Sequence, residues 1–147
     1  MRAGLVVALG LATQSAEPPA HAEKPEWVLD AQAPDHAVRG ARSTLILDLK
    51  ARAGFHVNDD YPLNFKPASN EGVTYAKARF DRSDGLLLDA CSADASHHCA
   101  ARLPVSFTPG QAGTARVGGT LSFSACDENR CLIEKVRLSV LVAVAER

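Results

Sequence analysis

The sequence is poor in aromatic residues and has no excess of charge of either sign. Aromatic residues make up 5% of the 147 residues, and 16 Lys+Arg against 17 Asp+Glu leave a net charge of −1. A dedicated nucleic-acid-binding protein carries a clear basic excess, so this balance argues against that class. With 46% apolar and 22% charged residues, the composition is that of an ordinary globular protein and excludes collagen-like and disordered chains. The length indicates one domain.

The common catalytic motifs are also missing. The sequence has no Cys-x-x-Cys motif, which excludes a thioredoxin-like catalyst, and no nucleophile elbow, zinc-protease helix, P-loop or dinucleotide-binding glycine motif. Two carboxylate pairs, Asp59-Asp60 and Asp81 with Asp84, are better explained as solvated loop charge than as acid–base catalysts. His56 lies in a short apolar stretch, and we expect it to be packed or hydrogen-bonded rather than catalytic.

The longest apolar run stands at the N terminus. Arg2 precedes the apolar stretch Ala3–Ala12, and Ala20–Ala22 has the Ala-x-Ala form of a signal-peptidase site. We therefore expect residues 1–22 to be a signal peptide that is cleaved after Ala22, with residues 23–147 forming a single domain. The alternative is an N-terminal core helix. The run is too short to span a bilayer, so we expect no membrane insertion after cleavage and a periplasmic or secreted bacterial protein.

Alternation of apolar and polar residues indicates an all-β domain. Leu45, Leu47 and Leu49 share one face of a predicted strand, and the clearest pattern spans Val136–Val144, where every second residue is apolar. Turn-forming residues recur every 8 to 12 residues, and no stretch gives a convincing amphipathic helix. The pattern predicts an immunoglobulin-like antiparallel β-sandwich of about seven to nine strands. Further predicted strands are Phe55–Val57, Val73–Phe80, Leu86–Leu88, Leu103–Phe107 and Val117–Phe123.

The first close pair of cysteines is Cys126 and Cys131, which we expect at the tip or mouth of a hairpin. Facing residues of a hairpin lie about 4.5–5.5 Å apart, within the Cα separation that a disulfide allows. Arg130 and Lys135 would favour a reactive thiolate, whereas Asp127 and Glu128 would oppose it. The alternatives are a redox-active pair and a plain structural bridge. Closing so short a loop contributes only about 2 kcal/mol, which makes the bridge a weak staple.

The second pair, Cys91 and Cys99, encloses a small polar segment that we expect to be an exposed loop. We assign this pair a structural disulfide, with a second exchange pair as the alternative. His97 and His98 beside Cys99 suggest a copper or zinc site. Adjacent side chains rarely chelate one ion in extended backbone, and no fourth ligand is apparent, so we predict neither a metal nor a cofactor.

Two segments resemble one domain family. Gly54–Pro62 reads GFHVNDDYP and is similar to the family's G-[FY]-H-[IV]-N-x-x-Y-P stretch. Leu121–Cys126 followed by Cys131–Lys135 resembles its F-x-x-C-x(4)-C-x(3)-K signature. The family is the N-terminal periplasmic domain of DsbD-type thiol:disulfide interchange proteins, and the similarity runs from about Trp27 to Val144.

The resemblance implies a function for the first pair. The family fold is an immunoglobulin-like sandwich whose paired cysteines pass electrons between periplasmic redox partners, and Cys126 and Cys131 match that pair. Expected partners are thioredoxin-like proteins or membrane thiol-redox proteins. In known members this domain is followed by a membrane domain and a thioredoxin-like domain. The sequence up to Arg147 contains neither, so we expect a separate protein to act as the reductant. Known members also shield the cysteines with an aromatic cap, whereas the corresponding region, about Asp81–Cys99, carries the second cysteine pair. The alternative function is a non-catalytic, disulfide-stapled sandwich that binds a protein partner.

Overall fold

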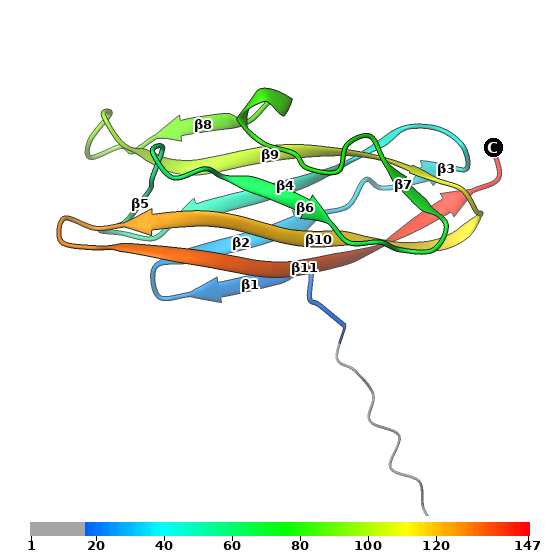
Figure 1. Ribbon diagram of the computed structural model, residues 1–147, viewed down its shortest axis with the longest axis horizontal. Helices are drawn as coiled ribbons and strands as arrows, with labels where there is room; N and C mark the ends of the chain where they lie inside the picture. The colour runs from blue at the N-terminus through cyan, green and yellow to red at the C-terminus, as the bar shows by residue number, and fades with distance from the viewer. Residues whose placement is uncertain (1–16) are drawn as a thin grey trace, which may run out of the picture.

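Strands form nearly all of the regular structure in the computed structural model, which describes residues 17–147 (Figure 1). Within these residues, the single helical element is the short 3-10 turn η1 (Arg82–Asp84). The strands are β1 (His21–Lys24), β2 (Trp27–Gln32), β3 (Ala37–Val38), β4 (Ser43–Ala51), β5 (His56–Val57), β6 (Asn64–Pro67), β7 (Val73–Tyr75), β8 (Leu87–Ala90), β9 (His98–Pro109), β10 (Gly113–Cys126) and β11 (Cys131–Ala145). Among residues 17–147, no helix has the length and apolar character needed to cross a membrane.

The strands pair in the order β1-β2-β4-β9-β5-β10-β11-β3, with β6 added to β10 and with β7 and β8 added to β9. All pairs are antiparallel except β11 with β3. The short β5 joins the half built on β4 and β9 to the half built on β10 and β11. Figure 1 shows these long strands running side by side along the molecule.

The core lies between the two halves. Trp27 on β2 packs edge-to-face on Phe123 of β10, with ring centroids 5.1 Å apart. Leu45, Leu47 and Leu49 on β4 are almost fully buried, as their alternation predicted. Leu138, Val142 and Val144 on β11 are also buried, as the alternation over Val136–Val144 predicted. The predicted all-β sandwich is therefore confirmed, with eleven strands in place of the expected seven to nine. Of the strands that were not predicted, β1, β3 and β6 are two to four residues long, whereas β2 alternates, with Trp27, Leu29 and Ala31 buried.

The largest departure from the predicted strands lies at Val73–Phe80. The strand expected over Val73–Phe80 ends at Tyr75, and Phe80 instead returns to the core in an isolated bridge with Phe65. Strand β10 continues through Gly118 and Gly119. Because these residues have no Cβ atom, the backbones of β11 and β6 can lie close to them. A Cβ atom on Gly119 would lie 2.2 Å from the Lys66 carbonyl oxygen on β6.

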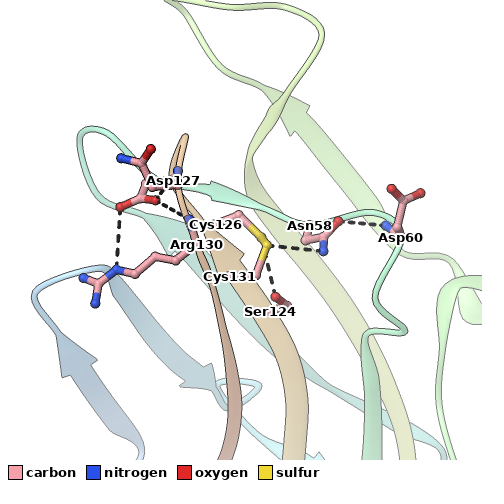
Figure 2. Close-up of a disulfide and its surroundings, with 8 residues drawn as sticks. Asn58, Asp60, Ser124, Cys126, Asp127, Arg130 and Cys131 are labelled. Carbon is pink, nitrogen blue, oxygen red and sulfur yellow. Dashed lines mark hydrogen bonds and ion pairs between the residues drawn. A yellow bond between two sulfur atoms is a disulfide. The ribbon is translucent and has the colours of Figure 1, made fainter.

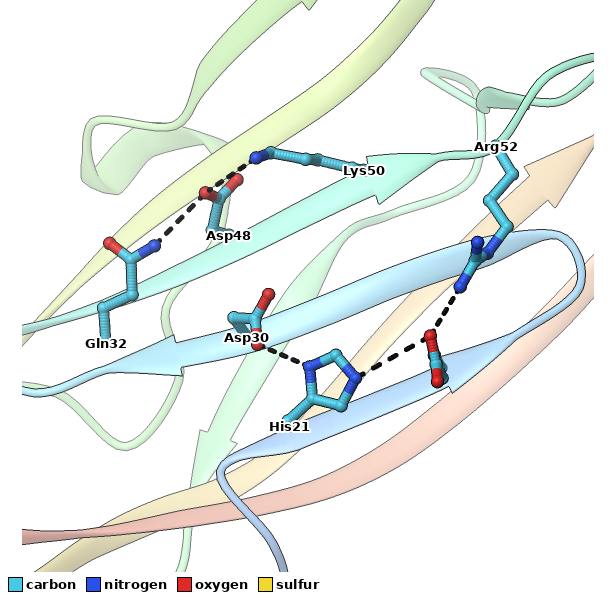
Figure 3. Close-up of polar contacts among 7 residues, drawn as sticks. His21, Asp30, Gln32, Asp48, Lys50 and Arg52 are labelled. Atoms are coloured by element: carbon cyan, nitrogen blue, oxygen red, sulfur yellow. Dashed lines mark hydrogen bonds and ion pairs between the residues drawn. The ribbon is translucent and has the colours of Figure 1, made fainter.

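A polar network covers the outer face of β2 and β4 (Figure 3). Asp48 points away from the core, yet it is only 6% exposed, because Gln32 donates a 3.3 Å hydrogen bond to it and Lys50 and Arg102 lie within ion-pair distance. At the edge, His21 Nδ1 lies 2.6 Å from Asp30 Oδ1, and this hydrogen bond raises the pKa of His21. These contacts tie β1 to the rest of the sheet.

Residues 17–22 pack onto the folded domain. The Pro18 carbonyl accepts a 2.6 Å hydrogen bond from the Ser139 hydroxyl, and the Pro19 carbonyl accepts one from the Ser139 N–H. The Ala31 N–H donates to the Ala20 carbonyl. The predicted cleavage point after Ala22 thus falls inside β1, while the predicted apolar run at residues 3–12 lies outside the described residues.

Candidate active site

The Cys126–Cys131 disulfide closes the β10–β11 hairpin, as the sequence predicted (Figure 2). Cys126 is the last residue of β10 and Cys131 the first of β11, and their Cα atoms are 4.0 Å apart. Asp127 shapes the turn between them, because its Oδ1 accepts hydrogen bonds from the N–H groups of Asn129 and Arg130, both at 2.8 Å. The sulfurs are held at the end of a rigid two-stranded ladder.

The two cysteines differ in exposure. Cys126 is 3% exposed, because its strand lies between β11 and β5, where it pairs with His56. Cys131 begins the edge of the hairpin and is exposed to solvent. A large reactant approaching from solvent therefore meets Cys131 first.

Each sulfur has one polar neighbour that the sequence analysis did not identify. The Ser124 hydroxyl lies 3.6 Å from Cys126 Sγ and is buried with it. The Asn58 Nδ2 amide lies 3.9 Å from Cys131 Sγ. Asn58 is fixed, because its N–H donates to the Ser124 carbonyl and its Oδ1 accepts from the Asp60 N–H, as Figure 2 shows for the latter. Asn58 lies in the Gly54–Pro62 stretch that carries the family resemblance, and this was the sequence signal that could have identified it as a neighbour of the disulfide.

The charged residues of the turn partly neutralise one another. Arg130 has its guanidinium 3.7 Å from an Asp127 oxygen and 3.9 Å from a Glu26 oxygen. Hydrogen bonds from the backbone N–H groups of Asn129 and Arg130 hold the pKa of the Asp127 carboxyl below its usual range. Arg130 therefore does not act as a lone positive charge on the sulfurs, and the hydrogen-bond donors Ser124 and Asn58 are the nearest groups suited to a thiolate.

The Cys91–Cys99 disulfide staples the loop between β8 and β9, as predicted. The Cys91 N–H donates to the His97 carbonyl at 2.8 Å, so the bridge and the backbone close the same loop. Asp94 Oδ1 accepts from the N–H and hydroxyl of Ser96, which fixes the loop tip. All these contacts are local and fit a structural bridge.

The strand β5 brings the two bridges to one end of the sandwich. His56 pairs with Cys126, and the carbonyl of the preceding Phe55 lies 3.8 Å from Cys99 Sγ. The His56 ring stacks on His97 of the stapled loop, with centroids 4.0 Å apart. Burial lowers the pKa of His56, and the neighbouring His97 adds to the shift. His56 is thus the packed histidine that the sequence analysis expected.

The histidines suggested as metal ligands face different carboxylates. His97 Nδ1 lies 2.9 Å from Asp94, and His98 Nδ1 lies 2.7 Å from Asp59 at an angle outside hydrogen-bond geometry. Cys99 is occupied by its disulfide. Within the part of the chain that the structure describes, no three His, Cys, Asp or Glu residues are grouped to hold a metal ion.

Comparisons with known proteins add little to this picture. No protein-family model matches the chain, and no curated protein matches it significantly. Among solved structures, it is similar to the ASH / PapD-like domain of human CEP192 (PapD-like domain 7), with 12% identity and a TM-score of 0.34 over 98% of this chain and 100% of that chain. A TM-score of this size does not establish a common fold.

Proposed function

We propose that the domain is a thiol–disulfide exchange module that passes reducing equivalents between periplasmic redox partners through Cys126 and Cys131. The observation that carries this proposal is the asymmetry of the hairpin disulfide. One sulfur belongs to an exposed residue and the other to a residue that is 3% exposed. A bridge built only to pin the hairpin has no need of an exposed cysteine beside a hydrogen-bond donor.

The asymmetry assigns a role to each cysteine. A thiolate of the partner attacks Cys131 Sγ, the Cys126–Cys131 bond breaks, and its electron pair leaves on Cys126 Sγ. The partner's second thiolate then attacks the partner sulfur of the mixed disulfide and releases Cys131 as a thiolate. Two electrons pass from the partner dithiol, which becomes a disulfide, to the domain, whose thiolates can take up two protons. In reverse, the reduced domain reduces a second partner.

The neighbouring donors support both thiolates. When the bond breaks, the buried Cys126 sulfur gains negative charge away from solvent, where an unpaired charge is costly. The Ser124 hydroxyl is placed to donate to it, and the Asn58 amide is placed to donate to Cys131. Hydrogen bonds to a charged acceptor are about twice as strong as neutral ones, so both contacts favour the reduced state.

The location and partner class follow from the sequence. The Arg2 and Ala3–Ala12 pattern supports export, and disulfides persist outside the cytosol. The resemblance of Gly54–Pro62 and of the cysteine-bearing hairpin to the DsbD N-terminal domain supports thioredoxin-like or membrane thiol-redox partners. Under this proposal Cys91–Cys99 is a structural staple and needs no exchange.

Single-cysteine variants test the proposal. In the Cys126→Ser variant the remaining Cys131 thiol should form a mixed disulfide with an aromatic disulfide reagent and with an oxidised thioredoxin-like protein. In the Cys131→Ser variant the buried Cys126 should react at least about tenfold more slowly, since exchange rates depend on access to the sulfur. The Cys91→Ser/Cys99→Ser variant is the matched control and should react like the wild type. Equal, slow reaction of both single variants would instead favour the stapled, non-catalytic sandwich.

A further inference from the structure

A cavity of about 230 Å³ opens beside the hairpin disulfide, next to β5 and β8. Its floor is apolar, with Val57 4% and Leu63 9% exposed. The half-buried Leu86 and Leu88 and the ring of Tyr61 form further apolar lining. Drug-sized ligands occupy sites of roughly 300–1,000 Å³, so this cavity suits a single large side chain better than a whole small molecule.

The rim of the cavity carries two available positive charges. Arg79 and Arg82 line it, both are exposed, and neither has a carboxylate within ion-pair distance among residues 17–147. The rim also carries two carboxylates, and neither lies within ion-pair distance of Arg79 or Arg82. Asp59 lies against His98, and Asp81 accepts hydrogen bonds from the N–H and hydroxyl of Ser83. The rim therefore has guanidinium groups to offer to an incoming carboxylate.

Asn58 connects the cavity to the reactive sulfur. It lines the cavity, and its side-chain amide lies 3.9 Å from Cys131 Sγ. A chain segment bound in the cavity therefore needs to extend only past the Asn58 side chain to reach the exposed cysteine. The backbone of Asn58 is held by Ser124, so this distance is fixed by the fold.

We propose that the cavity docks the cysteine-bearing segment of the thiol-redox partner, which places a large apolar side chain between Leu86 and Leu88 and a neighbouring carboxylate on Arg79 and Arg82. The inference rests on the proposed function, because that function makes a protein thiol the reactant at Cys131. The two unpaired guanidinium groups and the size of the cavity select an apolar–acidic peptide segment as the occupant. Docking at this point would hold the partner sulfur near Cys131 Sγ and favour it over a free thiol.

Binding of unreactive peptides tests the docking independently of redox chemistry. The probes are fluorescent peptides of equal length with serine in place of the partner's cysteine and with Leu-Asp, Leu-Lys or Gly-Asp beside it. The oxidised wild type should bind the Leu-Asp peptide about tenfold more tightly than either of the others, because one apolar contact and one ion pair each distinguish them. Arg79→Glu/Arg82→Glu should remove the preference for Asp over Lys. Arg42→Glu/Lys66→Glu makes the same charge change on exposed residues outside the cavity and should keep that preference.

Several results would overturn the docking proposal. Equal affinity for the three peptides would do so, as would an equal loss of preference in the Arg42→Glu/Lys66→Glu control. Binding of free hexanoate as tightly as the Leu-Asp peptide would assign the cavity to small acids instead. Reduction of the wild type by dithiothreitol is measured separately: if Cys126–Cys131 resists reduction while the Leu-Asp preference is present, the exchange function fails and the docking site stands.

Discussion

Ser124 is one of the few polar side chains that are fully buried, at 1% exposed, and its hydroxyl faces the buried sulfur of Cys126. In the oxidised protein this contact is weak, because a disulfide sulfur is a poor acceptor. Its value rises when Cys126 becomes a thiolate. At the residue scale, Ser124 and Asn58 are therefore the side chains whose removal should change the chemistry more than the fold.

Ser124→Ala should slow reduction of the hairpin disulfide. A hydrogen bond to a charged group is worth about 1.5–3 kcal/mol, so its loss raises the pKa of the leaving Cys126 thiol by about one unit or more and slows its departure roughly three- to tenfold. The measurement is the rate of reduction by excess dithiothreitol at pH 7. Ser122→Ala, on the same strand but off the sulfur, is the control and should leave the rate unchanged. An unchanged rate in Ser124→Ala would show that the hydroxyl does not support the thiolate.

His56 should make the domain less stable in mild acid. Its folded-state pKa is lowered by burial and by His97, whereas the unfolded value is near 6.5. As the pH falls through 6.5, the unfolded chain takes up the proton first, so the stability that His56 contributes above this pH is lost as the pH approaches the folded pKa. Comparing urea midpoints at pH 7.5 and pH 5, His56→Gln should show a smaller drop than the wild type. His36→Gln, on an exposed loop, should drop as the wild type does; an identical drop in all three proteins would exclude His56 as a source.

At the scale of the elements, β10 is the strand on which both the core and the site depend. It pairs with β11 along its whole length and also with β5 and β6. Gly118 accepts this crowding on the side of β11, where a Cβ atom would lie 2.2 Å from the Leu138 carbonyl oxygen. Its N–H donates to the Tyr75 hydroxyl at 3.0 Å, and its carbonyl accepts from the same hydroxyl at 3.1 Å. Gly119 accepts it on the other side, against β6.

Gly119→Ala should destabilise the fold by about 3 kcal/mol or more, since its Cβ would lie 2.2 Å from a backbone oxygen that belongs to a paired strand. Thermal unfolding, followed by fluorescence of the single Trp27, measures the change. Ser122→Ala on the same strand serves as the control. A loss below about 1 kcal/mol, the typical effect of an ordinary substitution, would show that β6 moves aside freely.

Residues 17–22, which include the first half of β1, should contribute to stability. A chain that begins at Glu17 keeps the hydrogen bonds that join Pro18 and Pro19 to Ser139 and Ala20 to Ala31, whereas a chain that begins at Glu23 loses them together with the pairing of His21 and Ala22 on β2. At about 0.5–1.5 kcal/mol for each net hydrogen bond, the three named bonds alone should make the longer chain more stable by about 1.5–4.5 kcal/mol. Urea unfolding of the two purified chains gives the difference. Equal stability would mean that residues 17–22 rest on the domain without holding it.

The sequence could predict features whose residues lie close together along the chain, but not contacts between residues far apart in the sequence. The β10–β11 hairpin, its disulfide and the Cys91–Cys99 loop are local, so alternation and short spacing were sufficient. The short strand at Phe55–Val57 was predicted, but its place as a junction was not, because its partners His98 and Cys126 lie far along the chain. Asn58 and Ser124 were missed as neighbours of the sulfurs for the same reason.

At the scale of the whole molecule, the β8–β9 and β10–β11 connections gather with β5 at one end of the sandwich, and the C terminus lies at the opposite end (Figure 1). These two connections carry the two disulfides. A hollow at the disulfide end is lined both by Cys91 and Cys99 and by Asp127 and Glu128 of the hairpin turn. The stapled loop and the β10–β11 hairpin therefore share one surface, and under the proposed function a partner that reaches Cys131 would approach this end. The staple keeps His97 against His56 and so fixes the wall of this hollow.

The most direct measurement of the central claim is the reduction potential of each disulfide in the intact protein. The oxidised chain is equilibrated with glutathione buffers, and alkylated peptides from the two cysteine pairs are quantified by mass spectrometry. Structural disulfides of exported proteins have potentials below about −300 mV, and exchanging ones lie higher. We predict a potential above −300 mV for Cys126–Cys131, with Cys91–Cys99 still oxidised in the same samples. A Cys126–Cys131 bridge that stays oxidised below −300 mV would contradict the exchange function and leave both disulfides as staples.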